Sequence, residues 1–172
     1  DMETAALQNT VGDYTTGSTT VARRVKGVEG FVTTNTATIT TAPTQAAINT
    51  QLQGCWTQGG NPDCIIVGGN NKTQISSLTV GVTKNLDAND RRLMTAVDVY
   101  ESDFGVLKVM PDRFDNTQTV KMLELDLWKV AQLRPMAITP LAKTGDTTKR
   151  QVLCEWTLES RAENGNAVLT TA

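Results

Sequence analysis

The sequence contains no histidine among its 172 residues, and this absence excludes several classes of enzyme. Without histidine there is no Ser-His-Asp or Cys-His nucleophilic catalysis, no imidazole ligand for a metal, and no general base of the usual kind near neutral pH. Aromatic residues make up only 5% of the chain, so a core must be built mainly from Val, Leu, Ile, Ala and Thr. An enzyme of this composition would depend on carboxylates, lysine or a bound cofactor.

Cysteine is also scarce, with Cys55, Cys64 and Cys154 widely spaced along the chain. An odd number at such spacing is not typical of a disulfide framework, and the lack of a C-x-x-C pair argues against a zinc site. All three have apolar neighbours in the sequence. We therefore expect small buried side chains in a protein of a reducing compartment.

Neither a long apolar run nor a strong charge of one sign is present. No stretch approaches the ~20 apolar residues of a membrane-spanning helix, and no signal peptide opens the chain, which begins at Asp1 and suggests a processed end. Sixteen basic and eighteen acidic residues leave a net charge of -2, so no overall basic field attracts nucleic acid. The length and the 39% of hydrophobic residues favour one compact domain, alone or with an inserted lobe.

The spacing of apolar residues predicts an α+β fold whose sheet has mostly antiparallel connections. Residues 45–58 are the clearest helix, with Thr44 as its cap, and a second helix is predicted over 72–78 after a buried strand at 64–67. Residues 2–10 are predicted to end a helix, and 79–94 to form a loop. Residues 31–34 and 37–40 are predicted to be short strands or extended segments. The other predicted strands are 96–100, 106–110, 120–125, 128–133 (which could instead be helical), 150–159 and 167–170.

The tryptophans divide into two groups by their place in these patterns. Trp56 and Trp156 fall on apolar stripes, so we expect both in the core. Trp128 is the only tryptophan that this interpretation leaves as a candidate for exposure.

Candidate sites for chemistry are weak. The glycines at 68–69 precede a helix, but the phosphate-loop spacing is missing, and the acids at 87–90 lack the calcium-loop series. A glycosylation sequon at 71–73 is interpreted as chance. Four carboxylates near the predicted hairpin allow a hydrolase as a hypothesis if they lie at a set separation: Glu101, Asp103, Asp112 and Asp115. We predict no catalytic, cofactor-binding or metal-binding residue.

The densest charge cluster lies between two predicted extended segments. It comprises Lys143, Asp146, Lys149 and Arg150. One interpretation is a solvated hairpin loop. The other is a contact between subunits, because alternating charges on a projecting loop suit a polar, oriented interface.

An ordered series of short motifs resembles the major head, or capsid, protein of a family of tailed bacteriophages with the Hong Kong 97 type capsid fold. The similarity covers roughly residues 45–160. The motifs are NPD at 61–63, VDVYESDFG at 97–105, LKV at 107–109, WKVA at 128–131, LRP at 133–135, LAKTGD at 141–146, KRQ at 149–151 and EWTLE at 155–159.

The resemblance implies a domain organisation and a set of partners. Residues 1–19 would hold the end of a spine helix and a loop of a peripheral domain, 20–132 an axial domain, and 133–172 the long peripheral strands and the C-terminus. The N-terminal arm and extended loop of such proteins would be missing. The chain would assemble with itself into hexameric and pentameric capsomers of an icosahedral shell in the virion, after assembly in the host cytoplasm.

Packaged DNA would lie on the inner face of this shell, which would not recognise its base sequence. A decoration or scaffolding protein could also bind the shell. No membrane partner is expected. The expected contacts between subunits are Arg134, Lys143, Asp146, Lys149 and Arg150.

Two other functions remain open at this point. The chain could be a stand-alone β-rich module that binds a ligand or surface, which predicts a concave site with exposed aromatic residues. It could also be a carboxylate-based hydrolase, which predicts two close carboxylates with perturbed ionisation. The leading hypothesis is a non-enzymatic structural protein of a bacteriophage head.

Overall fold

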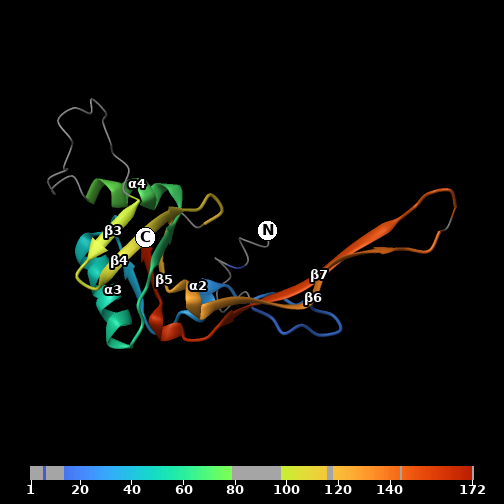
Figure 1. The fold of residues 1–172 in the computed structure, drawn as a ribbon, viewed down its shortest axis with the longest axis horizontal. Coiled ribbons are helices and arrows are strands. Elements are labelled where there is room, and N and C mark those ends of the chain that lie inside the picture. Colours follow the sequence, from blue (N-terminus) through green and yellow to red (C-terminus); the bar gives the residue numbers. More distant parts are fainter. Residues whose placement is uncertain (1–5, 7–13, 79–97, 116–117, 144, 172) are drawn as a thin grey trace, which may run out of the picture.

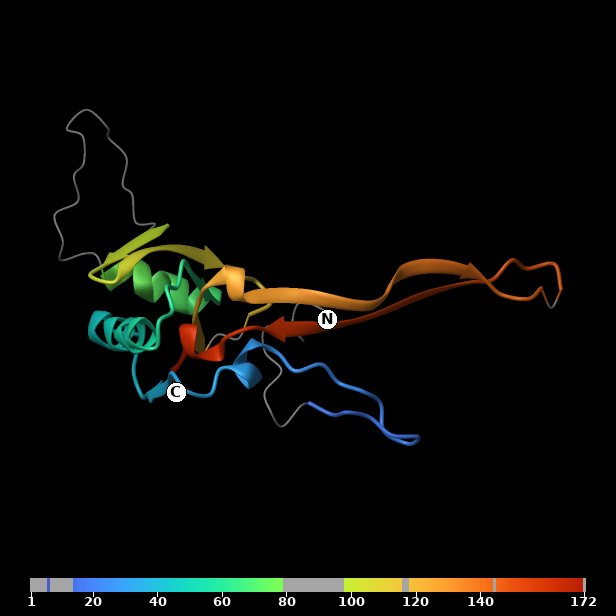
Figure 2. The same ribbon diagram turned by 60° about the horizontal axis from the view of Figure 1, so that its bottom comes forward.

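The computed structural model describes residues 6, 14–78, 98–115, 118–143 and 145–171. A body made of a mixed sheet and its helices carries a long two-stranded arm, which projects far beyond it (Figures 1 and 2). Ala6 is helical, and the other residues of the predicted helix at 2–10 lie outside the described part, as does the whole predicted loop at 79–94.

The sheet of the body has six strands in the order β1-β8-β5-β2-β4-β3. β1 pairs with β8 and β2 with β4 in parallel, whereas the other neighbours are antiparallel. This confirms the predicted α+β class with mixed, mostly antiparallel pairing. The strands are β1 (Thr36–Ile39), β2 (Cys64–Val67), β3 (Val99–Ser102), β4 (Gly105–Pro111), β5 (Thr119–Leu123) and β8 (Ala167–Thr171).

Two helices cover one face of this sheet. α3 (Gln45–Thr57) begins as predicted, because the Thr44 hydroxyl accepts a hydrogen bond from the Ala47 N–H at 3.2 Å. α4 (Gly69–Leu78) begins three residues earlier than predicted. Their apolar sides meet the sheet in the main core, whose fully buried members include Ile48, Leu52, Ile65, Ile75, Met122 and Leu169.

The opposite face is covered by a short helical turn and by the beginning of the arm. This turn, α2 (Val28–Phe31), packs with Leu123, Leu158 and Val168 in a second apolar cluster. Of the two alternatives for residues 31–34, the strand is therefore wrong. The backbone N–H groups of Thr33 and Thr34 donate to the Glu163 carboxylate at 2.8 and 3.2 Å instead of pairing with a strand.

The hairpin predicted around residues 101–105 is confirmed. β3 and β4 pair with Ser102 opposite Gly105, so Asp103 and Phe104 form a two-residue turn. Gly105 adopts φ 147°, a conformation that favours glycine. The predicted start of β3 at 96–97 lies outside the described residues.

The arm consists of β6 (Trp128–Pro140) and β7 (Arg150–Ser160), which pair antiparallel. The helical alternative for 128–133 is thus excluded. Two register shifts interrupt the ladder, between Gln132 and Arg134 and between Arg134 and Ala137. β8 follows the arm and returns to the middle of the body sheet. The predicted division into axial and peripheral domains remains a prediction.

The prediction that Trp56 and Trp156 lie in the core is wrong. Trp56 is 63% exposed, because it follows Cys55 by one residue and points away from the stripe that faces the sheet. Trp156 is half-buried on the arm. Trp128 is also half-buried, and its Nε1–H donates to Asn166 Oδ1 at 2.9 Å.

A polar junction joins the arm to the body. Asn166 is fully buried; its Oδ1 accepts from the Glu124 N–H at 3.0 Å as well as from Trp128, and its Nδ2 donates to the Ala162 carbonyl at 2.8 Å. Beside it, η4 (Glu163–Gly165) holds the Glu163 carboxylate against Thr33 and Thr34. These bonds fix the direction in which the arm leaves the body.

The Glu163 carboxylate gives the junction a defined pH dependence. Burial raises its pKa, but the hydrogen bonds from Thr33 and Thr34 outweigh burial and leave the pKa below the ordinary value of 4.5. A carboxyl whose pKa is lower in the folded state stabilises the fold above its unfolded pKa, and this stabilisation is lost as the pH falls through the folded pKa. We expect Glu163→Gln to lower the free energy of unfolding by roughly 1–2 kcal/mol at pH 7.

Urea unfolding from pH 7 to pH 3 measures this effect. The difference between Glu163→Gln and the original protein should shrink as the pH falls below about 4.5. Glu159→Gln is the control, because Glu159 lies on the surface and contacts Arg161 at 3.4 Å. A Glu163→Gln difference that stays constant across this range would contradict the assignment.

Candidate functional site

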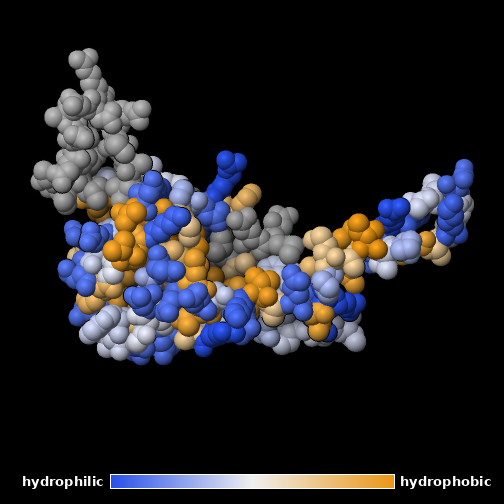
Figure 3. All heavy atoms as spheres, viewed as in Figure 1, coloured by the Kyte–Doolittle hydropathy of each residue, from blue (hydrophilic) through white to orange (hydrophobic). Residues whose placement is uncertain are grey.

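The arm exposes large apolar side chains over most of its length. Figure 3 shows several of them on the projecting part, between charged residues. In the described part of the chain, the most exposed large hydrophobic residue is Leu133, at 75%. The exposed apolar residues of the arm and its end are Val130, Leu133, Met136, Ile138, Leu141, Val152 and Leu153.

This surface has the physical properties of one that another molecule covers. A two-stranded ribbon is marginally stable in water, and each of its strands has one unpaired edge. Contiguous exposed apolar side chains mark sites of protein interaction more often than free surface. Each strand also has residues that limit pairing with other chains: β6 contains Pro135 and Pro140, and β7 contains the charged Arg150, Glu155 and Glu159.

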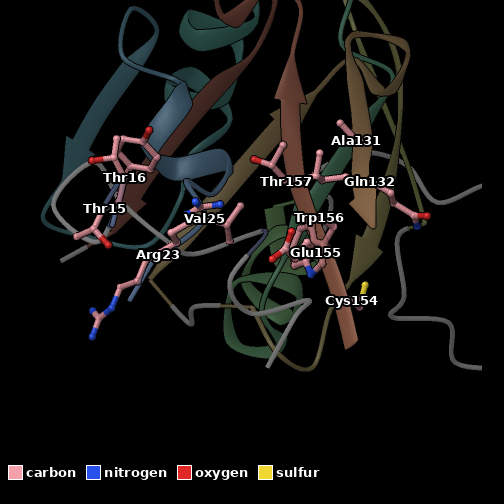
Figure 4. Close-up of a pocket in the computed structure, with 13 residues that line it drawn as sticks. Thr15, Thr16, Arg23, Val25, Ala131, Gln132, Cys154, Glu155, Trp156 and Thr157 are labelled. Atoms are coloured by element: carbon pink, nitrogen blue, oxygen red, sulfur yellow. The ribbon is translucent and has the colours of Figure 1, made fainter. Parts of the chain in front are cut away.

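A cleft of about 770 Å³ lies where the arm leaves the body. One wall is the extended segment around residues 14–25, in which Thr15 and Arg24 form an isolated bridge, and the other wall is the arm (Figure 4). Tyr14 and Trp156 supply aromatic surface, and Glu155 Oε2 contacts Arg134 Nε at 3.0 Å. The cleft therefore combines aromatic surface with an ion-paired carboxylate.

The charged residues predicted as subunit contacts all belong to the arm. Lys143, Asp146, Lys149 and Arg150 are exposed at its tip, where the Leu141 N–H donates to the Lys149 carbonyl at 3.0 Å. Arg134 lies midway along β6 and is 59% exposed despite its pair with Glu155. The structure therefore brings four of the five together at one end of the molecule and places the fifth nearer the body.

The four carboxylates of the hydrolase hypothesis do not form one site. Asp103 and Asp112 lie beyond opposite ends of the seven-residue β4, which separates them by roughly 20 Å. Asp115 is fully buried and forms an ion pair with Lys121. Glu101 is exposed on β3 beside the turn. The four carboxylates are therefore spread over the hairpin turn, the far end of β4 and the core, and they do not converge on one place.

Two of the three cysteines, Cys55 and Cys64, are buried thiols that are poor nucleophiles. Burial raises the pKa of the Cys55 thiol to about 11 and that of Cys64 to about 12, so both stay protonated at neutral pH. Cys154 is half-buried in the cleft. Within the described ranges, no group of three or more Cys, Asp or Glu side chains is arranged to hold a metal ion.

The remaining sequence motifs also lack a site. Gly68 alone links β2 to α4, and Gly69 is the first residue of that helix. The sequon asparagine, Asn71, is fully buried and donates from Nδ2 to the Thr119 carbonyl at 3.2 Å, so its amide is not available to a sugar. The acidic stretch at 87–90 lies outside the described residues. No helix in the described part is long and apolar enough to cross a membrane.

A family model for the SU10 major capsid protein matches residues 1–172, the whole chain. The chain belongs to this family. Its role is therefore structural, as part of a capsid. This family assignment confirms the leading hypothesis, which was a structural protein of a bacteriophage head.

Two solved structures similar to this chain are an encapsulin complex and a virus-like particle. This capsid protein is similar to the SrpI encapsulin of Synechococcus elongatus PCC 7942, with a TM-score of 0.58 and 10% identity over 84% of the chain and 56% of the encapsulin. A virus-like particle from Pyrococcus furiosus gives a TM-score of 0.48 and 12% identity over 78% and 55%. The chain thus spans just over half the length of these proteins. Among curated proteins, none matches it.

The fold predicted from the resemblance is confirmed by the encapsulin likeness. The exposed apolar surface of the arm, in contrast, was not predicted. The alternation of Val152, Cys154, Trp156 and Leu158 predicted one buried face of a strand, but only Leu158 reaches the apolar cluster of the body. Pro135 and Pro140 were the available signal, because proline within a strand indicates an edge without a partner.

Proposed function

We propose that the protein builds a closed shell by associating with copies of itself, and that the arm is the main contact between neighbouring copies. One observation carries this proposal: the arm leaves the body with its apolar side chains exposed, up to 75% at Leu133. Burial of apolar side chains is the main driving force of association. A repeated contact of this kind requires neither a catalytic residue nor a cofactor.

We further propose that the shell is icosahedral and built from hexameric and pentameric capsomers. The body, with its six-stranded sheet, would point toward the centre of a capsomer as the axial domain. The arm would belong to the peripheral domain, at the contacts between subunits. Heterologous contacts repeated around a rotation axis generate closed rings, which supports this arrangement.

The other proposed partners follow from the place of such a shell in a virion. Packaged DNA would face its inner surface through phosphates alone, without base readout. A decoration or scaffolding protein would bind the assembled subunits. Assembly would take place in the host cytoplasm. The charged residues proposed as subunit contacts are Arg134, Lys143, Asp146, Lys149 and Arg150.

Polar substitutions on the arm test the proposal. In the full-length protein, the triple variant Leu133→Ser, Met136→Ser and Ile138→Ser should reduce the fraction in large assemblies at least about ten-fold, because it removes apolar contacts at the interface. Size exclusion with light scattering measures this fraction. Since the three side chains are 63–75% exposed, unfolding of the isolated subunit should change little.

The matched control is a variant with two substitutions on the body. Val99 and Val106 are 58% and 61% exposed, so Val99→Ser with Val106→Ser removes similar apolar surface away from the arm. This variant should assemble as the original protein does. The proposal fails if the full-length protein stays monomeric at every salt and protein concentration, and the role of the arm fails if the arm variant assembles normally.

A further inference from the structure

Opposite charges gather at the two ends of the arm. The tip exposes Lys143, Lys149 and Arg150 around a single acid, Asp146. At the root, η3 (Leu125–Leu127) leads into β6, and three acids lie on or beside it: Asp63, Glu124 and Asp126. Two basic residues, Lys129 and Arg161, lie beside the same turn, but Arg161 is paired with Glu159 at 3.4 Å, so the root stays acidic in balance. Asp63 Oδ1 accepts from the Leu125 N–H at 3.1 Å, and Glu124 Oε2 accepts from the Asn61 N–H at 2.8 Å, so these two carboxylates are held in place. Leu125, which lies between Glu124 and Asp126 in the sequence, is 44% exposed.

The same separation of charge extends over the whole molecule. The arm segment 128–161 holds six of the sixteen basic residues but only three of the eighteen acidic ones. It therefore carries a charge of +3, and the rest of the chain carries -5, which together give the net charge of -2. Such a dipolar molecule favours contacts that place the basic part of one copy against the acidic part of another.

The tip and the root of one chain cannot meet. β6 has thirteen residues, which span roughly 43 Å in extended conformation, and the arm is extended in both views (Figures 1 and 2). The attraction between the two surfaces can therefore be satisfied only between two molecules. A contact between different surfaces of two copies is heterologous, and each added copy leaves one free tip and one free root.

We propose that the basic tip of one arm binds the acidic root of the arm of a second copy, with Lys143, Lys149 and Arg150 facing Asp63, Glu124 and Asp126. This inference rests on the proposed self-association and names the surface that receives the arm. The exposed Leu141 of the tip and Leu125 of the root supply an apolar centre to the contact. In this arrangement the tip of one arm meets the root of the next. The apolar side chains between the tip and the root of each arm remain available for contact with a neighbouring copy.

A nucleic acid is the other partner that a basic tip suits, but the arm favours a protein. Phosphates pair with Lys and Arg, yet they leave Leu133, Met136 and Ile138 uncovered. The acidic root has the opposite sign to the tip and belongs to the same chain, so every subunit supplies both halves of the contact. If the tip binds DNA instead, a gel-shift assay with duplex DNA detects it.

Charge reversal and its compensation test the inference in the full-length protein. Lys149→Glu with Arg150→Glu at the tip should raise the concentration needed for assembly at least about ten-fold at 0.05 M salt. Asp126→Lys at the root should weaken assembly in the same direction; this exposed residue has no hydrogen bond or ion pair among the described residues. Combining the tip and root reversals should restore assembly to within about three-fold of the original protein.

The matched control applies the same change of charge elsewhere. Lys108→Glu with Arg113→Glu alters the exposed surface of the body by the same amount and should leave assembly unchanged. Light scattering reports assembly, and a gel-shift assay with duplex DNA reports nucleic-acid binding. Tip reversal that abolishes DNA binding but not assembly would overturn the inference, and so would a combined variant no better than the tip variant. Either result leaves the arm's apolar contact intact, whereas a normal assembly of the arm serine variant would refute the proposed function itself.

Discussion

Replacing Lys121 with methionine is expected to lower the free energy of unfolding by roughly 3–5 kcal/mol, one of the two largest effects that we predict for this protein. Lys121 lies in β5 with its side chain fully buried, and its Nζ contacts the carboxylates of Asp115 and Glu29, the latter at 2.9 Å. It also donates to Thr119 Oγ1 at 2.9 Å. Without the ammonium, two carboxylates remain in a site with little access to water.

Urea unfolding followed by circular dichroism measures this change. Arg161→Met is the control, because Arg161 pairs with Glu159 at 3.4 Å and both side chains are about half exposed, so this variant should cost less than about 1 kcal/mol. Adding Asp115→Asn to Lys121→Met should recover part of the loss, since it removes one of the two unpaired charges. A loss below 1 kcal/mol for Lys121→Met would show that the buried carboxylates do not depend on the lysine.

Gly60→Ala should lower the free energy of unfolding by about 3 kcal/mol because no space exists for a methyl group. A Cβ atom on Gly60 would lie 2.2 Å from Gly165 Cα and 2.8 Å from the Gly165 carbonyl oxygen. Both are backbone atoms, so a side-chain rotation cannot relieve the overlap. The loop after α3 and the turn η4 would have to separate at the junction that holds the arm.

Thermal unfolding of the isolated subunit checks this expectation. Gly69→Ala is the control, because a Cβ atom on Gly69 meets no atom within 4 Å and alanine suits the first turn of α4. This variant should be as stable as the original protein or slightly more so. Equal stability of Gly60→Ala and Gly69→Ala would mean that the close approach at Gly165 is not required for the fold.

The elements predicted well from sequence are those whose signals are local. The helix α3 has its cap at Thr44 and its apolar stripe at Ile48, Leu52 and Cys55, all within four turns. The hairpin β3–β4 has alternating residues and a glycine at the turn. Trp56 shows the limit of this reasoning: a position at the margin of an apolar stripe does not reveal whether the sheet extends far enough to cover it.

Features that depend on distant partners could not be predicted. The ion pairs of Lys121 join residues from α2, β5 and the loop after β4, and no spacing in the sequence links them. The segment 31–34 has the composition of a strand, yet its backbone bonds to Glu163, some 130 positions later. A strand was also the natural interpretation of Arg150–Ser160, but whether a strand is covered depends on what packs against it.

The candidate site was predicted in part. The resemblance identified the structural role and directed attention to the charged tip of the arm. The apolar residues of β6, such as Leu133 and Ile138, were not singled out, because an exposed apolar residue and a buried one give the same pattern along a strand. Only the structure shows that, beyond its root, the ribbon projects from the body, with its apolar side chains exposed (Figures 1 and 2).

The position of β8 has a consequence for the order of events during synthesis. This strand inserts between β1 and β5, and its first pair joins Thr36 to Val168. The ribosome must therefore complete the whole arm before the body sheet can close. Contacts between residues so far apart in the chain slow folding, and a nascent chain lacking β8 has β1 separated from the other strands. Translation itself thus delays the compact body until the arm is present, so each subunit acquires a finished body and an assembly surface in the same late step.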